Sequence, residues 1–165
     1  DIGGGETPRD AINHDPETGN LIIGPCNGGP YHTIKRRPKG GDQLYLRSLL
    51  ALDAKTGRMK WYYQQTPGDN WDFTSTQPII LTHMKIDGID RPVLIHAPKN
   101  GYLYILDRRD GKLLRANPIV RVNWADGIDA KTGRPHLRPD LIIRIRVKVR
   151  VRVRVRVRVR GYIRV

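Results

Sequence analysis

A five-residue turn that begins with Asp and ends with Gly occurs four times in this chain, and it constrains the fold more than any other feature. The copies are DPETG at 15–19, DAKTG at 53–57, DRRDG at 107–111 and DAKTG at 129–133. The aspartate side chain can accept backbone N–H bonds inside such a turn, and glycine takes the positive φ that other residues resist. Residues typical of strands flank the copies, so the pattern predicts a repeated β-hairpin.

Repeated hairpins at intervals of tens of residues indicate a propeller or an array, because one four-stranded sheet cannot bury both of its faces alone. The 17 Gly and 12 Pro residues also favour many short strands over long helices. We predict an all-β fold, with a short hairpin connection at 98–101. The expected strands cover 21–24, 44–52, 59–65, 77–84, 92–97 and 102–106, after a glycine-rich segment at 1–13.

The positive charge of the chain is concentrated at one end. The formal net charge is +14, but residues 141–165 hold ten Lys or Arg and no acid, so residues 1–140 carry only +4. We therefore divide the chain into 1–140 and a cationic tail, 141–165, and expect no specific nucleic-acid binding.

The tail alternates Val and Arg almost perfectly between Arg144 and Arg160, which is a strong strand pattern of low complexity. Three interpretations stay open. The one we favour is translation of a short nucleotide repeat at a frameshift or assembly error. The others are a cationic strand that binds membranes or polyanions non-specifically, and an edge strand that completes a sheet.

Cysteine content excludes two kinds of site. Cys26 is the only cysteine, so the chain can form no internal disulfide and no cysteine-rich zinc cluster. The five histidines lack metal-ligand spacing and are interpreted as surface or strand residues. The chain begins without Met, and we expect it to be a fragment.

Several ordered motifs resemble one enzyme family. GGDQLYL, ALDAKTG-x-x-x-W-x-YQ-x-TPGDNWD, APKNGYLYILDR and VNWADGIDAKTGRP follow one another between about residues 3 and 135. In this order they are similar to the quinoprotein alcohol dehydrogenases. The resemblance implies about three blades of an eight-bladed β-propeller, with pyrroloquinoline quinone (PQQ) and calcium as cofactors, in a periplasmic enzyme that passes electrons from a primary alcohol to a cytochrome c-type acceptor.

The aromatic turn unit at 51–72 resembles the tryptophan-docking motif of this family. The resemblance implies that Trp61 packs against a neighbouring blade, which is a structural role.

By the same resemblance, Asp72 is the base that accepts the alcohol proton as hydride passes to the quinone, and it lies beside the metal. A carboxylate held next to a cation stays ionised and oriented toward the proton that it accepts, as general-base catalysis requires. The alternative is an aspartate that only caps a corner, a role that also suits Asp69.

Three further residues match cofactor positions. Asn27 matches an amide ligand of calcium, and Lys99 matches a cation that contacts the redox carbonyl of the quinone. Thr7 matches a threonine that hydrogen-bonds the cofactor. The alternatives are a plain Asn27-Gly28 hairpin turn and a solvated lysine in a hairpin.

The chain also departs from the family pattern. Arg9 stands where the family has the Trp that forms the floor beneath the quinone, Cys26 stands where it has Gly, and the family's glutamate ligand lies upstream of residue 1. We expect this chain alone to be inactive. The competing hypotheses are a propeller segment without cofactor and a cationic polyanion- or membrane-binding protein acting through the tail.

Overall fold

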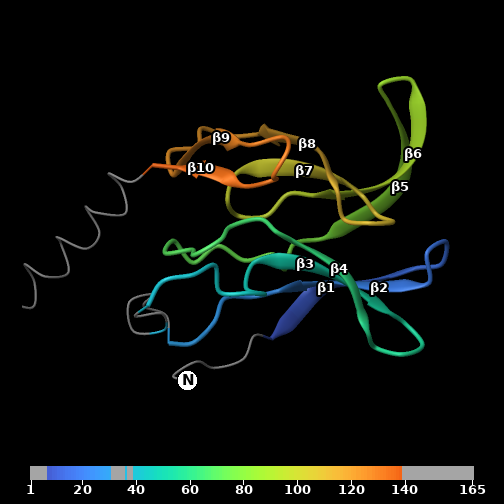
Figure 1. Cartoon of the computed structure of the whole chain (residues 1–165), viewed down its shortest axis with the longest axis horizontal. Helices are drawn as coiled ribbons and strands as arrows, with labels where there is room; N and C mark the ends of the chain where they lie inside the picture. The colour runs from blue at the N-terminus through green and yellow to red at the C-terminus, as the bar shows by residue number, and fades with distance from the viewer. Residues whose placement is uncertain (1–6, 31–35, 37–38, 139–165) are drawn as a thin grey trace, which may run out of the picture.

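The elements of the described chain are ten β-strands (Figure 1). The computed structural model describes residues 7–30, 36 and 39–138, so the predictions for the tail at 141–165 lie outside the described residues. The strands are β1 (Pro8–Asp15), β2 (Asn20–Pro25), β3 (Ser48–Asp53), β4 (Met59–Gln64), β5 (Ile79–Ile86), β6 (Ile89–His96), β7 (Tyr102–Asp107), β8 (Leu113–Pro118), β9 (Ala125–Ile128) and β10 (Pro135–Leu137).

Antiparallel pairing joins these strands into two four-stranded sheets and one small hairpin. The first sheet has the order β1-β2-β3-β4, the second has β5-β6-β7-β8, and β9 pairs with β10. Each four-stranded sheet runs in chain order, as in a propeller blade. The all-β prediction is confirmed, while the number of blades stays a prediction.

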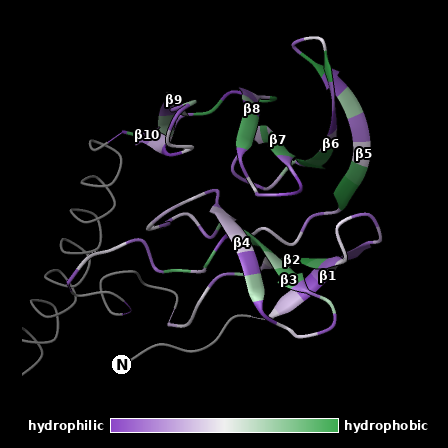
Figure 2. Ribbon diagram, turned by 45° about the vertical axis from the view of Figure 1, so that its right-hand side comes forward, coloured by the Kyte–Doolittle hydropathy of each residue, from purple (hydrophilic) through white to green (hydrophobic). Residues whose placement is uncertain are grey.

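The two sheets pack face to face around one apolar core (Figure 2). Hydrophobic stretches, drawn green, lie on strands of both sheets. Alternate residues of a strand point to opposite faces, so every second side chain of β7 is fully or nearly fully buried, as at Tyr102, Tyr104 and Leu106. From the first sheet, the core takes Ile22, Leu49, Ala51, Trp61 and Tyr63.

All four Asp-Gly turns form as predicted. In each, the glycine N–H donates to the carbonyl oxygen of the opening aspartate at 2.8–2.9 Å, and the glycine φ lies between 69° and 74°. The aspartate Oδ1 accepts backbone N–H bonds, as Asp53 does from Thr56 at 2.9 Å and from Lys55 at 3.1 Å. The hydrogen bond from the Thr56 backbone is the main cause that lowers the pKa of half-buried Asp53 to about 2.

The antiparallel order gives the pair of sheets two different ends. At one, which we call the turn end, lie three Asp-Gly turns, at 15–19, 53–57 and 107–111, on the right of Figure 1. At the other, the loop end, lie the longer connections 65–78 and 97–101 and the segment that follows β2. Each residue predicted for the cofactor site lies at the loop end.

At the turn end, Trp61 confirms the predicted docking contact. Its indole Nε1 donates to the carbonyl oxygen of Arg108 in the second sheet at 3.2 Å. The ring covers Gly111 so closely that a Cβ added to that glycine would lie 2.5 Å from the indole Cε3.

The predicted strands differ from the observed ones in several places. Residues 8–13 belong to β1 and not to an irregular segment, and β8, β9 and β10 were not among the predicted strands. Residues 44–47 form a turn and not the start of a strand: Leu46 N–H donates to Gln43 at 2.9 Å, and Gln43 and Arg47 have positive φ. This turn lets the Arg47 side chain reach a buried partner, described below.

Candidate functional site

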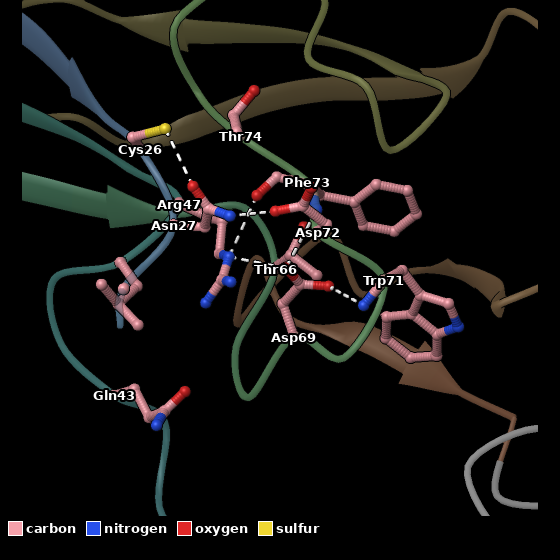
Figure 3. Close-up of polar contacts among 12 residues, drawn as sticks. Cys26, Asn27, Gln43, Arg47, Thr66, Asp69, Trp71, Asp72, Phe73 and Thr74 are labelled. Atoms are coloured by element: carbon pink, nitrogen blue, oxygen red, sulfur yellow. Dashed lines mark hydrogen bonds and ion pairs between the residues drawn. The ribbon is translucent and has the colours of Figure 1, made fainter. Parts of the chain in front are cut away.

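The side chains of Asn27 and Asp72 meet at the loop end (Figure 3). The Asn27 amide Nδ2 donates to Asp72 Oδ1, across 45 residues of sequence. Both side chains are half-buried. On its other side, the Asn27 Oδ1 accepts a hydrogen bond from the Cys26 thiol at 3.0 Å. The two residues predicted to share a metal are therefore in direct contact.

Backbone structure brings this pair together from two segments. Asn27 follows β2 by two residues, and Asp72 lies in the 65–78 connection between the sheets. The Ser75 N–H donates to the Pro25 carbonyl oxygen at 3.3 Å, which ties the connection to the end of β2. Asp72 itself has a φ of 61°, in the left-handed region that most residues with a Cβ avoid.

A buried ion pair supports the Asp72 loop. Arg47 Nε lies 2.6 Å from Asp69 Oδ2, and the two side chains are 3% and 0% exposed. Asp69 also accepts the N–H of Trp71 at 2.7 Å and that of Phe73 at 3.0 Å, so the predicted corner cap is present. Burial raises the pKa of Asp69, an effect that the charge of Arg47 opposes.

The aromatic rings of the two residues that flank Asp72 in the sequence form a wall with the ring of Trp124. Trp71 and Phe73 stack with ring centroids 5.8 Å apart, and each ring lies 5.6 Å from that of Trp124. The Trp124 Nε1 donates to the Asn100 carbonyl oxygen at 2.7 Å. The wall therefore joins the 65–78 connection to the 97–101 hairpin.

Lys99 lies in that hairpin, exposed, without a hydrogen bond or ion pair to another residue of the described chain. The next residue, Asn100, is buried and fixes the hairpin to the Asp72 loop, because its Nδ2 donates to Thr66 Oγ1 at 3.1 Å. The structure therefore places Lys99 at the same end as Asp72 and Asn27, but not in contact with them.

Thr7 is also exposed and also lies at the loop end. It precedes β1, whose residue Pro8 pairs with Pro25 of β2, two positions before Asn27. No hydrogen bond joins Thr7 to Asn27, Asp72 or Lys99 within the described residues. Of the four predicted residues, Asn27 and Asp72 touch each other. Lys99 and Thr7 lie at the same loop end without a hydrogen bond to them.

Sequence analysis missed a buried polar network at the loop end. His96 Nε2 lies 3.1 Å from the carbonyl oxygen of Gln77, and Nδ1 lies 3.0 Å from Gln65 Nε2, an arrangement that fits a neutral ring with its proton on Nε2. Ser75 Oγ donates to Gln65 Oε1 at 2.9 Å. Burial lowers the pKa of His96 to about 4. The network connects β6 to the loop that holds Asp72.

Arg47 was missed as well, although the sequence holds a signal for it. The residue is a lone cation in the otherwise largely apolar run LYLRSLLAL at 44–52. A charge at such a place is seldom buried without a partner of opposite sign.

The donor chemistry of the site fits a hard cation. Carboxylate and amide oxygens are the ligands that Ca²⁺ prefers, and Asp72 and Asn27 supply both kinds on touching side chains. Within 7–30, 36 and 39–138, no three His, Cys, Asp or Glu residues gather as a metal site. Because such a cation takes six to eight oxygens, other segments would have to supply the rest.

Comparison with known proteins identifies the family of the chain. A family model described as "PQQ: Glucose/ethanol/alcohol dehydrogenase, beta-propeller domain" matches residues 12–125. The quinohemoprotein alcohol dehydrogenase of Comamonas testosteroni is 53% identical over 135 residues, which are 82% of this chain and 19% of that protein. The 1-butanol dehydrogenase (cytochrome c) of Thauera butanivorans is 49% identical over 116 residues, 70% of this chain and 17% of that protein.

Solved structures show the same similarity. The crystal structure of the Comamonas testosteroni quinohemoprotein alcohol dehydrogenase matches with a TM-score of 0.79 at 52% identity, over 82% of this chain and 20% of that one. A europium-containing methanol dehydrogenase matches with a TM-score of 0.78 at 37% identity, over 82% of this chain and 23% of that one.

The chain belongs to the PQQ-dependent alcohol dehydrogenase family and forms part of its β-propeller domain. It spans 19% of the length of the Comamonas protein and 17% of that of the Thauera protein, so it corresponds to a fragment of them. In the described part of the chain, no helix is long and apolar enough to cross a membrane.

Proposed function

We propose that this chain is the part of a PQQ-dependent alcohol dehydrogenase that carries the base and one metal ligand. In this proposal, Asp72 accepts the proton of a primary alcohol, and Asn27 binds a metal ion, calcium or a lanthanide, next to it. The direct contact between the Asn27 amide and the Asp72 carboxylate is the observation that carries the proposal.

The surroundings of Asp72 support its role as a base. The half-buried carboxylate is partly shielded from water, and its contact with the Asn27 amide fixes one of its oxygens. A positioned general base contributes roughly 10²–10⁴-fold to a rate. Asp72 can also bind the metal, so its carboxylate is a candidate both for a metal ligand and for the general base.

Lys99 and Thr7 are proposed to contact the cofactor at the loop end. PQQ, when bound, supplies the electron sink that accepts hydride from the alcohol. The exposed Lys99 ammonium has no partner among the described residues, so it is available to stabilise negative charge at a bound oxygen. The Thr7 hydroxyl is likewise free to donate a hydrogen bond.

The remaining features of the proposed enzyme come from its relatives. The name of the Thauera protein specifies a cytochrome c, which supports an electron acceptor of that kind for this enzyme. A periplasmic location is proposed on the same family relationship.

The activity test needs the rest of the propeller. Residues 7–138 would replace the matching stretch of the Comamonas testosteroni enzyme, and dye reduction by a primary alcohol would be followed with PQQ and Ca²⁺ present. Asp72→Asn should lower kcat by about 10²–10⁴-fold. Asp126→Asn, an exposed aspartate paired only with Arg138 in the described chain, is the matched control and should keep full activity. Full activity of the Asp72→Asn enzyme would refute the assignment.

The isolated chain provides a second test. We expect it to be inactive with PQQ, Ca²⁺, alcohol and dye, because the loop end holds only two proposed metal ligands. Alcohol-dependent dye reduction by the chain alone would contradict this expectation.

A further inference from the structure

Asp69 holds the backbone on both sides of Asp72. Its Oδ1 accepts the N–H of Trp71 at 2.7 Å, and its Oδ2 accepts the N–H of Phe73 at 3.0 Å. These are the residues immediately before and after Asp72. One carboxylate therefore restrains the direction in which the Asp72 side chain leaves the loop; its bond to Trp71 is drawn in Figure 3.

Arg47 holds the same loop from the first sheet. Its Nε lies 2.6 Å from Asp69 Oδ2 and also donates to the Phe73 carbonyl oxygen at 3.0 Å. Arg47 is anchored in turn, because its own carbonyl oxygen accepts the Gln65 N–H at 3.0 Å. The pair thus connects the start of β3 to three backbone atoms around Asp72.

This support matters because Asp72 has a backbone conformation that an L-residue does not favour. A φ of 61° costs about 1–2 kcal/mol for most residues with a Cβ and less for Asp, so a free loop would populate other conformations as well. If the φ of Asp72 relaxed, its carboxylate would turn away from Asn27. The hydrogen bonds from Trp71 and Phe73 to Asp69 oppose that change.

The charge of the pair also suits a positioning role. A lone Asp69 carboxylate three residues from Asp72 would repel the carboxylate that the site needs in its ionised form. Arg47 lies against Asp69 with 3% of its side chain exposed, and its positive charge balances that of Asp69. The Arg47–Asp69 pair therefore orients the Asp72 carboxylate without adding net negative charge to the site.

We propose that Arg47 and Asp69 are positioning residues for Asp72, which hold its carboxylate against the Asn27 amide. The inference rests on the proposed function, in which Asp72 is the base. Neither residue has to touch the alcohol or the quinone. A pair that only stabilised the fold would leave the contact between Asn27 and Asp72 unchanged when it was weakened.

Nuclear magnetic resonance of the 165-residue chain can test this proposal without cofactor or metal. Because Asn27 Nδ2 donates to the Asp72 carboxylate, the side-chain amide signal of Asn27 should be shifted downfield from that of a solvent-exposed asparagine. Asp69→Asn keeps the shape of the side chain but removes its charge, and it should abolish that shift. The indole signals of Trp61 and Trp124 report whether the two sheets remain packed.

The matched control is the other deeply buried ion pair, at the turn end. Arg108 Nη1 lies 2.9 Å from Asp15 Oδ1, with side-chain exposures of 6% and 0%. Asp15→Asn should leave the downfield shift of the Asn27 side-chain amide intact. Arg47→Lys keeps the positive charge but loses the shared Nε, so it should weaken the shift without abolishing it.

Each outcome decides one question. An unchanged Asn27 shift in folded Asp69→Asn would overturn the positioning role, and so would loss of both indole signals in Asp69→Asn and Arg47→Lys, which would assign the pair to folding alone. Absence of the shift in the unaltered chain would instead refute the juxtaposition on which the proposed function rests.

Discussion

The indole of Trp61 lies directly against the α-carbon of Gly111, in the neighbouring sheet. The space that a Cβ would occupy on Gly111 is filled by the ring, at 2.5 Å from Cε3 and 2.7 Å from Cδ2. Gly111 also has a φ of 74°. Two independent requirements, backbone conformation and space, therefore select glycine at this position.

Replacement of Gly111 by Ala should destabilise the chain for both reasons. Gly57, in the corresponding turn of the first sheet, has a φ of 70° and no atom within 4 Å of an added Cβ. Gly57→Ala should therefore cost only the backbone part, about 1–2 kcal/mol. Gly111→Ala should cost about 1–3 kcal/mol more because the ring has to move. Urea denaturation of both variants gives the difference, and equal costs would contradict the packing argument.

Tyr63 should hold the β9-β10 hairpin onto the first sheet. Its hydroxyl donates to the Gly133 carbonyl oxygen at 2.8 Å, and an added Cβ on Gly133 would lie 2.6 Å from the Tyr63 ring. Tyr63→Phe should cost about 1–3 kcal/mol, since it leaves a buried carbonyl without its donor. Hydrogen exchange should rise most in 125–137. Tyr62→Phe, at a 43% exposed position, is the control and should leave exchange unchanged.

Acid should destabilise the chain through His96. Burial lowers the pKa of His96 to about 4, below the 6.5 of an exposed imidazole, so the folded state resists the proton that the unfolded state binds. The stabilisation is complete above pH 6.5 and is lost as the pH falls toward 4, by roughly 3 kcal/mol. Urea midpoints measured across this range in the native chain and in His96→Gln check it. The variant should lose this part of the pH dependence, whereas the exposed His14→Gln should keep it.

His83 should show the opposite pH dependence. Its hydrogen bonds to Glu17 at 3.0 Å and Asp90 at 3.2 Å raise the pKa of His83, with the Glu17 bond as the main cause. Arg108, whose Nη2 lies 3.2 Å from His83 Nε2, also faces the ring. Because the pKa of His83 is raised in the folded state, protonated His83 stabilises the fold below pH 6.5. This stabilisation disappears as the pH rises through the pKa of His83 in the folded state.

Titration of the His83 ring signal gives this value directly. Glu17→Gln should lower it, and added salt should reduce the effect because the group is exposed. A value that stays the same in Glu17→Gln would refute the role of that carboxylate. Lys85→Gln, on the same strand, is a control that removes a charge without touching the contact.

Much of the fold could be predicted because its main signals are local. Each Asp-Gly turn is defined within five residues, so the sequence contains everything that shapes it, and all four form. β1 was missed because Arg9, Asp10 and His14 interrupt any alternation of polar and apolar residues. Its place as an edge strand, paired only with β2 in the described chain, depends on the neighbouring strand and not on its own composition.

The candidate site was predictable only where a motif named its residues. The contact between Asn27 and Asp72 joins segments 45 residues apart, and the resemblance to the quinoprotein family, not spacing, indicated it. Arg47 and His96 belong to no such motif. Their roles follow from the partners that folding brings to them, Asp69 and Gln65, at separations that a single sequence does not reveal.

The contact between Trp61 and Gly111 gives the stack of sheets a direction. The first sheet offers an aromatic ring to its neighbour, while its own turn glycine, Gly57, faces open space. Sheets that present an indole on one side and a turn glycine on the other pack head to tail. In such a series every turn glycine is covered by an indole only when the series closes on itself. The direction in which the sheets add to one another is thus already encoded in the geometry of one indole and one glycine.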